Sequence, residues 1–311
     1  EICLLESGSG LSCRMVAGVR ASSIAAAGLV AVCSGVAAWV VPRLPWPYPD
    51  RLAPIPAEDA EIDNVRPYDA IEKWAPNGSQ AGLHLMNPAR VAYFDGTIRG
   101  AVQPPFRVLD LGCGGGLVSN ALARMPDYEV IEGVDLSSEA LSYAVATAGK
   151  VSGGPRVHFQ NGSLYDLPFQ QSTFNVVILS DVLEHLLDVP RALNEAARVL
   201  RPGGVLLFDT IDRSLVSFIV AILGAEYIVR IINRGSHDWR LFLRPGETKK
   251  ALEAAGFRSF VYADFQPSLR ALLELSSFSA GFIAADQMMG GWNIGPPSAL
   301  MISYIGHAVK E

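Results

Sequence analysis

From Arg107 onward, short apolar runs alternate with longer stretches of helical periodicity. The longer stretches predict helices at Leu117–Arg124, Ser138–Ala148, Arg191–Leu200 and Thr248–Ala255. The apolar runs predict six strands: Arg107–Leu111, Tyr128–Val134, Val157–Gln160, Asn175–Ser180, Gly204–Asp209 and Ala299–Val309. Strands that alternate with helices favour a doubly wound α/β domain, in which a mostly parallel sheet has helices on both faces. Ligands bind such a sheet beyond the carboxyl ends of its strands, so the residues that follow the strands are candidate site residues.

The first fifty residues have a different pattern. Ser7–Pro49 contains no acidic residue, and Ala21–Pro42 is uncharged and largely apolar. At a rise of about 1.5 Å per residue, such a stretch can cross a bilayer core of roughly 30 Å, and an acid-poor start is also typical of a transit peptide. Residues 1–56 therefore predict a leader with a targeting or membrane-anchor segment that ends in a stiff Pro-rich linker, Pro42–Pro56. A leader without a targeting role is the alternative. Residues 57–311 form the main domain.

Composition narrows the function classes. Half of the 311 residues are hydrophobic, which allows a sizeable core, and the net charge of −6 argues against a general nucleic-acid binder. The four cysteines have neither metal-site nor disulfide-framework spacing, so they favour a reducing compartment.

A glycine-rich loop follows the first strand. Its spacing is G-x-G-x-G, beginning at Gly112, and position 117 is Leu, so the dinucleotide fingerprint G-x-G-x-x-G is absent. No Lys-Ser or Lys-Thr pair follows, so a triphosphate-binding loop is absent too. Glycines at these positions allow a ligand to approach the backbone closely. The second strand ends at Asp135, where a carboxylate can accept both hydroxyls of a ribose. Gly112, Gly114 and Asp135 therefore predict a nucleoside site.

Three potential metal ligands follow the fourth strand. If the turn there is helical, Asp181, Glu184 and His185 lie on one face, at i, i+3 and i+4. Two carboxylates and an imidazole that converge in this way predict a divalent-metal site. The alternative is that the cluster orients the loop without a metal.

An apolar insertion, residues 210–245, follows Asp209. Its segment Ser214–Ala225 has no charge and is too short to span a bilayer. It is a candidate to cover an apolar substrate or to lie in a membrane surface, with an ordinary packed helix as the alternative. Within the same insertion, His237 is the candidate catalytic residue, although a lone histidine is more often structural.

These features together resemble the class I S-adenosylmethionine methyltransferases, and most closely the ubiquinone-biosynthesis O-methyltransferases. The resemblance implies a seven-stranded, mostly parallel, Rossmann-like sheet with an antiparallel last strand, and S-adenosyl-L-methionine as the cofactor. Arg90 would then reach the methionine carboxylate, and Ser180 would contact the cofactor through its backbone. The stretches that carry the resemblance are Leu83–Arg90, Asp110–Gly116, Ser180–His185, Gly224–Arg230 and Gly235–Asp238.

The resemblance also implies a substrate and partners. The substrate would be a polyprenylated catechol or hydroquinone, with Mg²⁺ or Zn²⁺ held by Asp181, Glu184 and His185 near its oxygens. Asp181 stands where the family usually has Glu. The implied partners are a membrane surface and other quinone-biosynthesis enzymes, on the matrix face of the mitochondrial inner membrane in a eukaryote, or otherwise on the cytoplasmic face of the inner membrane. Two alternatives stay open: a methyltransferase for another small or lipid acceptor, and a membrane-tethered scaffold without turnover, against which the intact Asp181–His185 cluster argues.

Overall fold

The structure is a computed structural model that describes residues 51–52, 71–148, 156–229, 232–280 and 291–311. The predicted leader and its Pro-rich linker lie outside the described residues, apart from Arg51 and Leu52. Within the described ranges, no helix combines the length and apolarity needed to cross a membrane.

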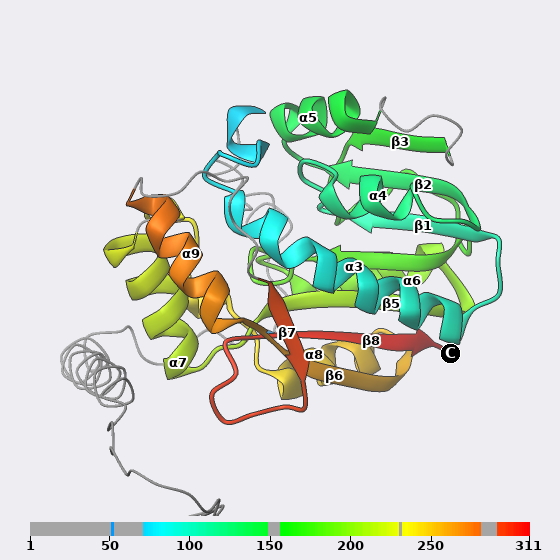
Figure 1. The fold of residues 1–311 in the computed structure, drawn as a ribbon. Coiled ribbons are helices and arrows are strands. Elements are labelled where there is room, and N and C mark those ends of the chain that lie inside the picture. The colour runs from blue at the N-terminus through cyan, green and yellow to red at the C-terminus, as the bar shows by residue number, and fades with distance from the viewer. Residues whose placement is uncertain (1–50, 53–70, 149–155, 230–231, 281–290) are drawn as a thin grey trace, which may run out of the picture. The chain divides into compact units, whose positions relative to one another are not determined.

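An eight-stranded sheet with the order β3-β2-β1-β4-β5-β8-β6-β7 forms the centre of the fold (Figure 1). The first five strands in this order pair in parallel, and β8 pairs antiparallel to β5 and β6. Side chains of the central strand β4 are fully buried from Val176 to Leu179, as both faces of a parallel sheet are covered by helices. The strands are β1 (Phe106–Leu111), β2 (Tyr128–Asp135), β3 (Arg156–Asn161), β4 (Phe174–Ser180), β5 (Leu200–Ile211), β6 (Phe257–Pro267), β7 (Trp292–Gly295) and β8 (Ser303–Lys310).

Two hydrophobic cores cover the two faces of the sheet. On one face, α3 (Ala81–Ala101) and α4 (Leu117–Leu122) contribute buried side chains such as Phe94. On the other face, α6 (Val189–Val199) and α8 (Pro245–Ala254) pack through residues such as Leu193. The helix α5 (Ser138–Ala148) lies over β3 and β2 (Figure 1). This layered arrangement leaves the loops after β1, β2, β4 and β5 at one edge of the sheet.

The fold class is the one expected from the sequence, with one strand more than the seven expected. The additional strand is the short edge strand β7, which pairs with β6. The sequence pattern also did not locate β6, α3 or the helix α9 (Leu269–Ser279). In β6, buried and exposed residues do not alternate cleanly, because a register irregularity between Arg258 and Val261 interrupts its pairing with β8.

The apolar insertion is helical, as expected for its first half. Ser214 caps the short helix α7 (Leu215–Ser217) through a hydrogen bond from the Ser217 amide, and the chain continues as the π-helix η4 (Phe218–Ile228). A one-turn 3-10 helix, η5 (Trp239–Leu241), follows. A π-helix of this length is unusual, and π-helical turns are frequently found at functional sites.

Candidate active site

The glycine loop after β1 is shaped by positive backbone angles and by a tryptophan ring. Gly112 and Gly114 have φ values of +69° and +49°, which side chains rarely adopt. A Cβ atom at Gly114 would lie 2.1 Å from the indole of Trp74, so only glycine fits beneath this ring. Trp74 comes from the 3-10 helix η3 (Ile71–Trp74), and its carbonyl accepts a hydrogen bond of 2.9 Å from the His84 ring. The sequence analysis missed Trp74, because no spacing rule relates it to the loop.

Asp135 lies beside this loop, as predicted. One carboxylate oxygen accepts a hydrogen bond of 2.8 Å from the amide of Gly114, and the other accepts one of 2.8 Å from the amide of Ser137. At the end of β3, the Asn161 side chain donates to the main-chain carbonyl of Asp135. The ends of β1, β2 and β3 therefore meet at a loop lined with backbone amides, which is where a nucleoside binds in this type of sheet. The contacts of Gly112, Gly114 and Asp135 with a cofactor stay a prediction.

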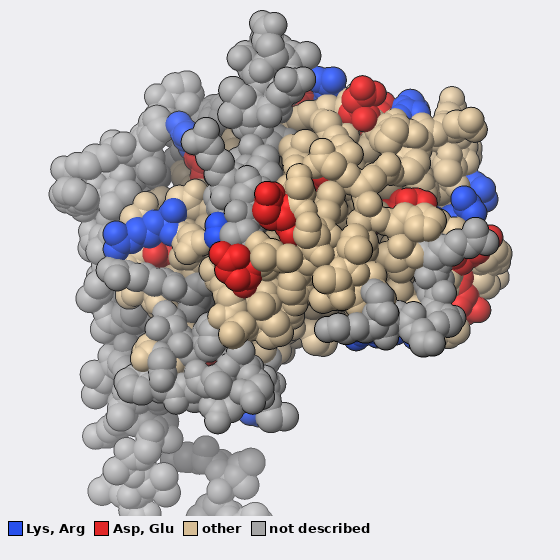
Figure 2. All heavy atoms as spheres, turned by 90° about the horizontal axis from the view of Figure 1, so that it is seen from above, with Lys and Arg blue, Asp and Glu red and all other residues tan. Residues whose placement is uncertain are grey.

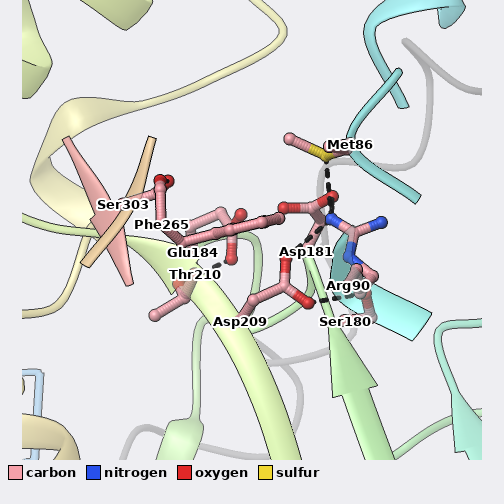
Figure 3. Close-up of polar contacts among 9 residues, drawn as sticks. All are labelled: Met86, Arg90, Ser180, Asp181, Glu184, Asp209, Thr210, Phe265 and Ser303. Carbon is pink, nitrogen blue, oxygen red and sulfur yellow. Dashed lines mark hydrogen bonds and ion pairs between the residues drawn. The ribbon is translucent and has the colours of Figure 1, made fainter. Parts of the chain in front are cut away.

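Arg90 joins α3 to the ends of β4 and β5 (Figure 3). Its guanidinium forms an ion pair with Asp181 and another, of 2.6 Å, with Asp209, and only 3% of its side chain is exposed. The Ser180 hydroxyl donates a 2.7 Å hydrogen bond to the other oxygen of Asp209. Arg90 thus contacts two protein carboxylates, and its predicted contact with a methionine carboxylate remains untested. Its Nε has no hydrogen-bond partner among the described residues, so one donor is still available.

Burial has the largest effect on the pKa of Asp209, which pairs with Arg90. Burial raises this pKa and the nearby Asp181 raises it further, whereas the charge of Arg90 lowers it. Glu184 is 1% exposed and accepts a 2.7 Å hydrogen bond from the Thr210 hydroxyl. Burial and Asp181 raise the pKa of Glu184 well above its ordinary value, which favours the neutral acid.

The predicted metal ligands do not form a ligand set. Asp181 has a φ of +51°, so it does not begin a helical turn, and the face that the i, i+3, i+4 spacing assumes does not exist. Asp181 is instead paired with Arg90, and Glu184 with Thr210. Within the described ranges, no group of three His, Cys, Asp or Glu side chains is placed to hold a metal ion. The residues therefore do not fit Mg²⁺ or Zn²⁺ in this arrangement.

His185 instead lies against His237, the candidate catalytic residue. The two rings stack with their centroids 5.3 Å apart and an angle of 27° between their planes. Burial, followed by the nearby His237, lowers the pKa of His185 to about 3, so its imidazole is neutral near pH 7. The structure thus brings a residue that follows β4 together with one from the insertion, far apart in the sequence.

Glu226 orients His237. Its carboxylate, 1% exposed on η4, accepts a 2.8 Å hydrogen bond from Nδ1 of His237. It also accepts hydrogen bonds from the main-chain amides of Gly235 and His237, at 2.8 and 3.0 Å. This contact favours the tautomer that donates from Nδ1, in which Nε2 has the lone pair that a general base requires. The sequence analysis did not single out Glu226, because it lies in an apolar helix without a visible partner.

Comparison with known proteins identifies relatives of this chain. The family model "Methyltransferase domain" matches residues 109–208. A ubiquinone biosynthesis O-methyltransferase of Azorhizobium caulinodans is 36% identical over 212 residues, which cover 64% of this chain and 82% of that protein. One of the same name from Methylocella silvestris is 32% identical and covers 75% and 88%. Among solved structures, the YcgJ protein of Bacillus subtilis has a similar fold, with a TM-score of 0.51, 18% identity and coverage of 72% of this chain and 99% of that one.

Replacing Asp135 tests the nucleoside site. Asp135→Ala should weaken the binding of S-adenosylhomocysteine by about 1–3 kcal/mol, because charge-assisted hydrogen bonds to the carboxylate are lost. Isothermal titration calorimetry measures this affinity. The matched control is Glu132→Ala on the same strand, where the carboxylate pairs with His158 at the surface and affinity should not change. Equal affinities for wild type and Asp135→Ala would remove Asp135 from the site.

Asp110, at the end of β1, should make stability depend on pH. It is 2% exposed, accepts a 2.6 Å hydrogen bond from Ser119, and burial raises its pKa from 3.8 to about 6. The stabilisation from the bound proton is complete below the unfolded value and is lost as the pH rises through about 6. Between about pH 4 and pH 6, the free energy of unfolding should fall by about 1.4 kcal/mol per pH unit more in the wild type than in Asp110→Asn. Urea unfolding at both pH values measures this difference, and parallel slopes would contradict it.

Proposed function

Because this chain belongs to the ubiquinone biosynthesis O-methyltransferase family, we propose that it methylates a hydroxyl group of a polyprenylated catechol or hydroquinone in ubiquinone biosynthesis. The methyl donor is S-adenosylmethionine, the cofactor of the family. We choose a phenolic acceptor because Glu226 is hydrogen-bonded to His237, whose ring stacks on His185 after β4. A methyl-transfer assay with labelled cofactor and a panel of prenylated catechols tests the proposal.

The proposed reaction is a direct methyl transfer. A free phenol has a pKa of about 10, so its hydroxyl must lose a proton to become a strong nucleophile near pH 7. Nε2 of His237 takes this proton while Glu226 holds the ring through Nδ1. Bound S-adenosylmethionine would supply the methyl group to the phenolate oxygen, and its sulfur would keep the electron pair of the S–C bond that breaks. The protein contributes mainly by aligning the two reactants.

The two rival functions predict different products. A methyltransferase for another acceptor, such as an amine, thiol or sterol, would bind S-adenosylhomocysteine but leave every prenylated catechol unmethylated. A scaffold without turnover would also bind the cofactor but methylate no acceptor. The orientation of His237 by a buried carboxylate favours the phenolic acceptor, because a hydroxyl proton must be removed near pH 7 and a neutral imidazole is suited to that task.

Replacing His237 tests its role. His237→Asn should lower kcat by about 100-fold or more, because the amide can still donate to Glu226 but does not accept a proton. Calorimetry should show unchanged affinity for S-adenosylhomocysteine. His158→Asn is the matched control, since His158 is a surface residue paired with Glu132, and its kcat should equal that of the wild type. A kcat for His237→Asn within twofold of the wild type would exclude His237 as the general base.

We also propose that the enzyme works at a membrane surface, because a polyprenyl substrate partitions into lipid. The insertion exposes apolar side chains at Leu215, Tyr227 and Ile228, and α9 exposes Leu269 and Leu273. Both elements lie on the same side of the sheet, at the left in Figure 1. On the face seen in Figure 2, the charged side chains of the described residues are scattered between larger uncharged areas. The proposed location is the matrix face of the mitochondrial inner membrane in a eukaryote, or otherwise the cytoplasmic face of the inner membrane, where other quinone-biosynthesis enzymes are the proposed partners.

Replacing Ile228 with a charged residue tests whether the insertion contacts a membrane. Ile228 is 69% exposed on η4, and burying an aliphatic side chain of this size contributes roughly 1.5–3 kcal/mol. In a chain that begins at Pro47, Ile228→Glu should therefore reduce cosedimentation with liposomes by about tenfold, and should reduce activity more on long-tailed than on short-tailed substrates. Val145→Glu on α5 adds the same charge at a site that is 56% exposed, and should have no effect. Equal lipid binding by the two variants would argue against the insertion as a membrane contact.

A further inference from the structure

Arg51 holds three main-chain carbonyls that belong to two separate loops. Its Nη1 donates a 3.1 Å hydrogen bond to the carbonyl of Leu187, and its Nη2 donates to that of Leu186. Its Nε donates a 3.1 Å hydrogen bond to the carbonyl of Leu241. The side chain is buried, with 4% exposed, although Arg51 lies in the segment that the sequence assigns to a linker.

These two loops carry the stacked histidines. Leu186 and Leu187 directly follow His185, and Leu241 ends η5, which begins two residues after His237. Arg51 thus bridges the two chain segments whose histidine rings lie face to face. On the loop after His185, the amide of Leu187 donates to the Tyr165 hydroxyl at 3.2 Å, so this loop is fixed through both its carbonyls and its amides.

The chemistry of Arg51 suits a bridge rather than an ion pair. A guanidinium presents donors in a rigid fork, so one side chain can reach carbonyls that diverge in direction, which an ammonium group does less well. Burial, followed by the charge of Arg213, lowers the pKa of Arg51 to about 10, and the group therefore remains charged near pH 7. A buried charge is costly unless it is well hydrogen-bonded, and here the three carbonyls provide that compensation.

We propose that Arg51 is a positioning residue that fixes His237 relative to His185, and that a residue upstream of the first strand is thereby part of the catalytic unit. The inference rests on the proposed function, since it assigns the acceptor to the side of the site that holds the two histidines. The contacts of Arg51 with the loops predict that its loss changes the acceptor side and leaves the glycine loop, which lies at the ends of β1 and β2, unaffected.

Substitutions of Arg51 in the full chain test the proposal. Arg51→Lys and Arg51→Ala should lower kcat by at least tenfold, with the affinity for S-adenosylhomocysteine within twofold of the wild type. Added guanidinium ion should restore part of the lost kcat of Arg51→Ala by occupying the same carbonyls. Arg198→Ala is the matched control, because Arg198 also donates to two main-chain carbonyls, those of Leu167 and Phe169, and to neither of the loops that Arg51 joins. It should keep the kcat of the wild type and show no response to guanidinium.

A second measurement does not depend on turnover. In the complex with S-adenosylhomocysteine, the NMR signals of the His185 and His237 rings should shift in Arg51→Lys. The signals of the remaining histidines, His84, His158 and His307, should stay in place and serve as internal references. Shifts confined to His185 and His237 support the proposal even if no prenylated catechol is methylated, an outcome that would contradict only the proposed function. Unchanged signals from these two rings, or a kcat equal to that of the wild type in folded Arg51→Ala, would overturn it.

Discussion

The buried ion pairs of Arg90 with Asp181 and Asp209 are the interaction on which the site depends. Together with Glu184, these residues place three carboxyl groups at the ends of β4 and β5, where Asp209 and Glu184 are buried and Asp181 is partly exposed. One guanidinium pairs with Asp181 and Asp209, and burial raises the pKa of the third carboxyl group, that of Glu184. Removing a single partner from such a set leaves an uncompensated buried charge, so α3 must remain docked on the sheet for the loop after β4 to keep its shape.

The pairing of Arg90 with Asp181 also bears on the arrangement of His185 and His237, on the proposed acceptor side of the site. Asp181 is held by Arg90 in a left-handed backbone conformation, and this turn sends the chain away from a helix. His185, which follows this turn, stacks on His237 of the insertion. A histidine ring that is stacked on a neutral neighbour and hydrogen-bonded through Nδ1 has one tautomer and one orientation, which suits a base that must meet its substrate in a fixed geometry.

The sequence predicted the parts that depend on local pattern. The alternation of strands and helices, the G-x-G-x-G loop and Asp135 at the end of β2 follow from residue order alone, and the structure places them as expected. The metal site could not be judged in this way, because the spacing of Asp181, Glu184 and His185 is compatible with a helix, and only the contact with Arg90, 91 positions away, decides against it. Glu226 was missed for a related reason, since its partner His237 lies beyond the end of the π-helix.

Trp74 and Arg51 show a further limit of what can be predicted from the sequence. Both lie upstream of the first strand, and neither belongs to a pattern that predicts a contact with the site. Each is nevertheless buried against a loop of the site: Trp74 against the glycine loop, and Arg51 against the carbonyls that follow His185 and His237. Both residues contact the loops through single side chains, and such contacts leave no periodicity in the sequence. In this enzyme the core can therefore be inferred from local order, whereas the residues that fix the loops to one another depend on long-range packing.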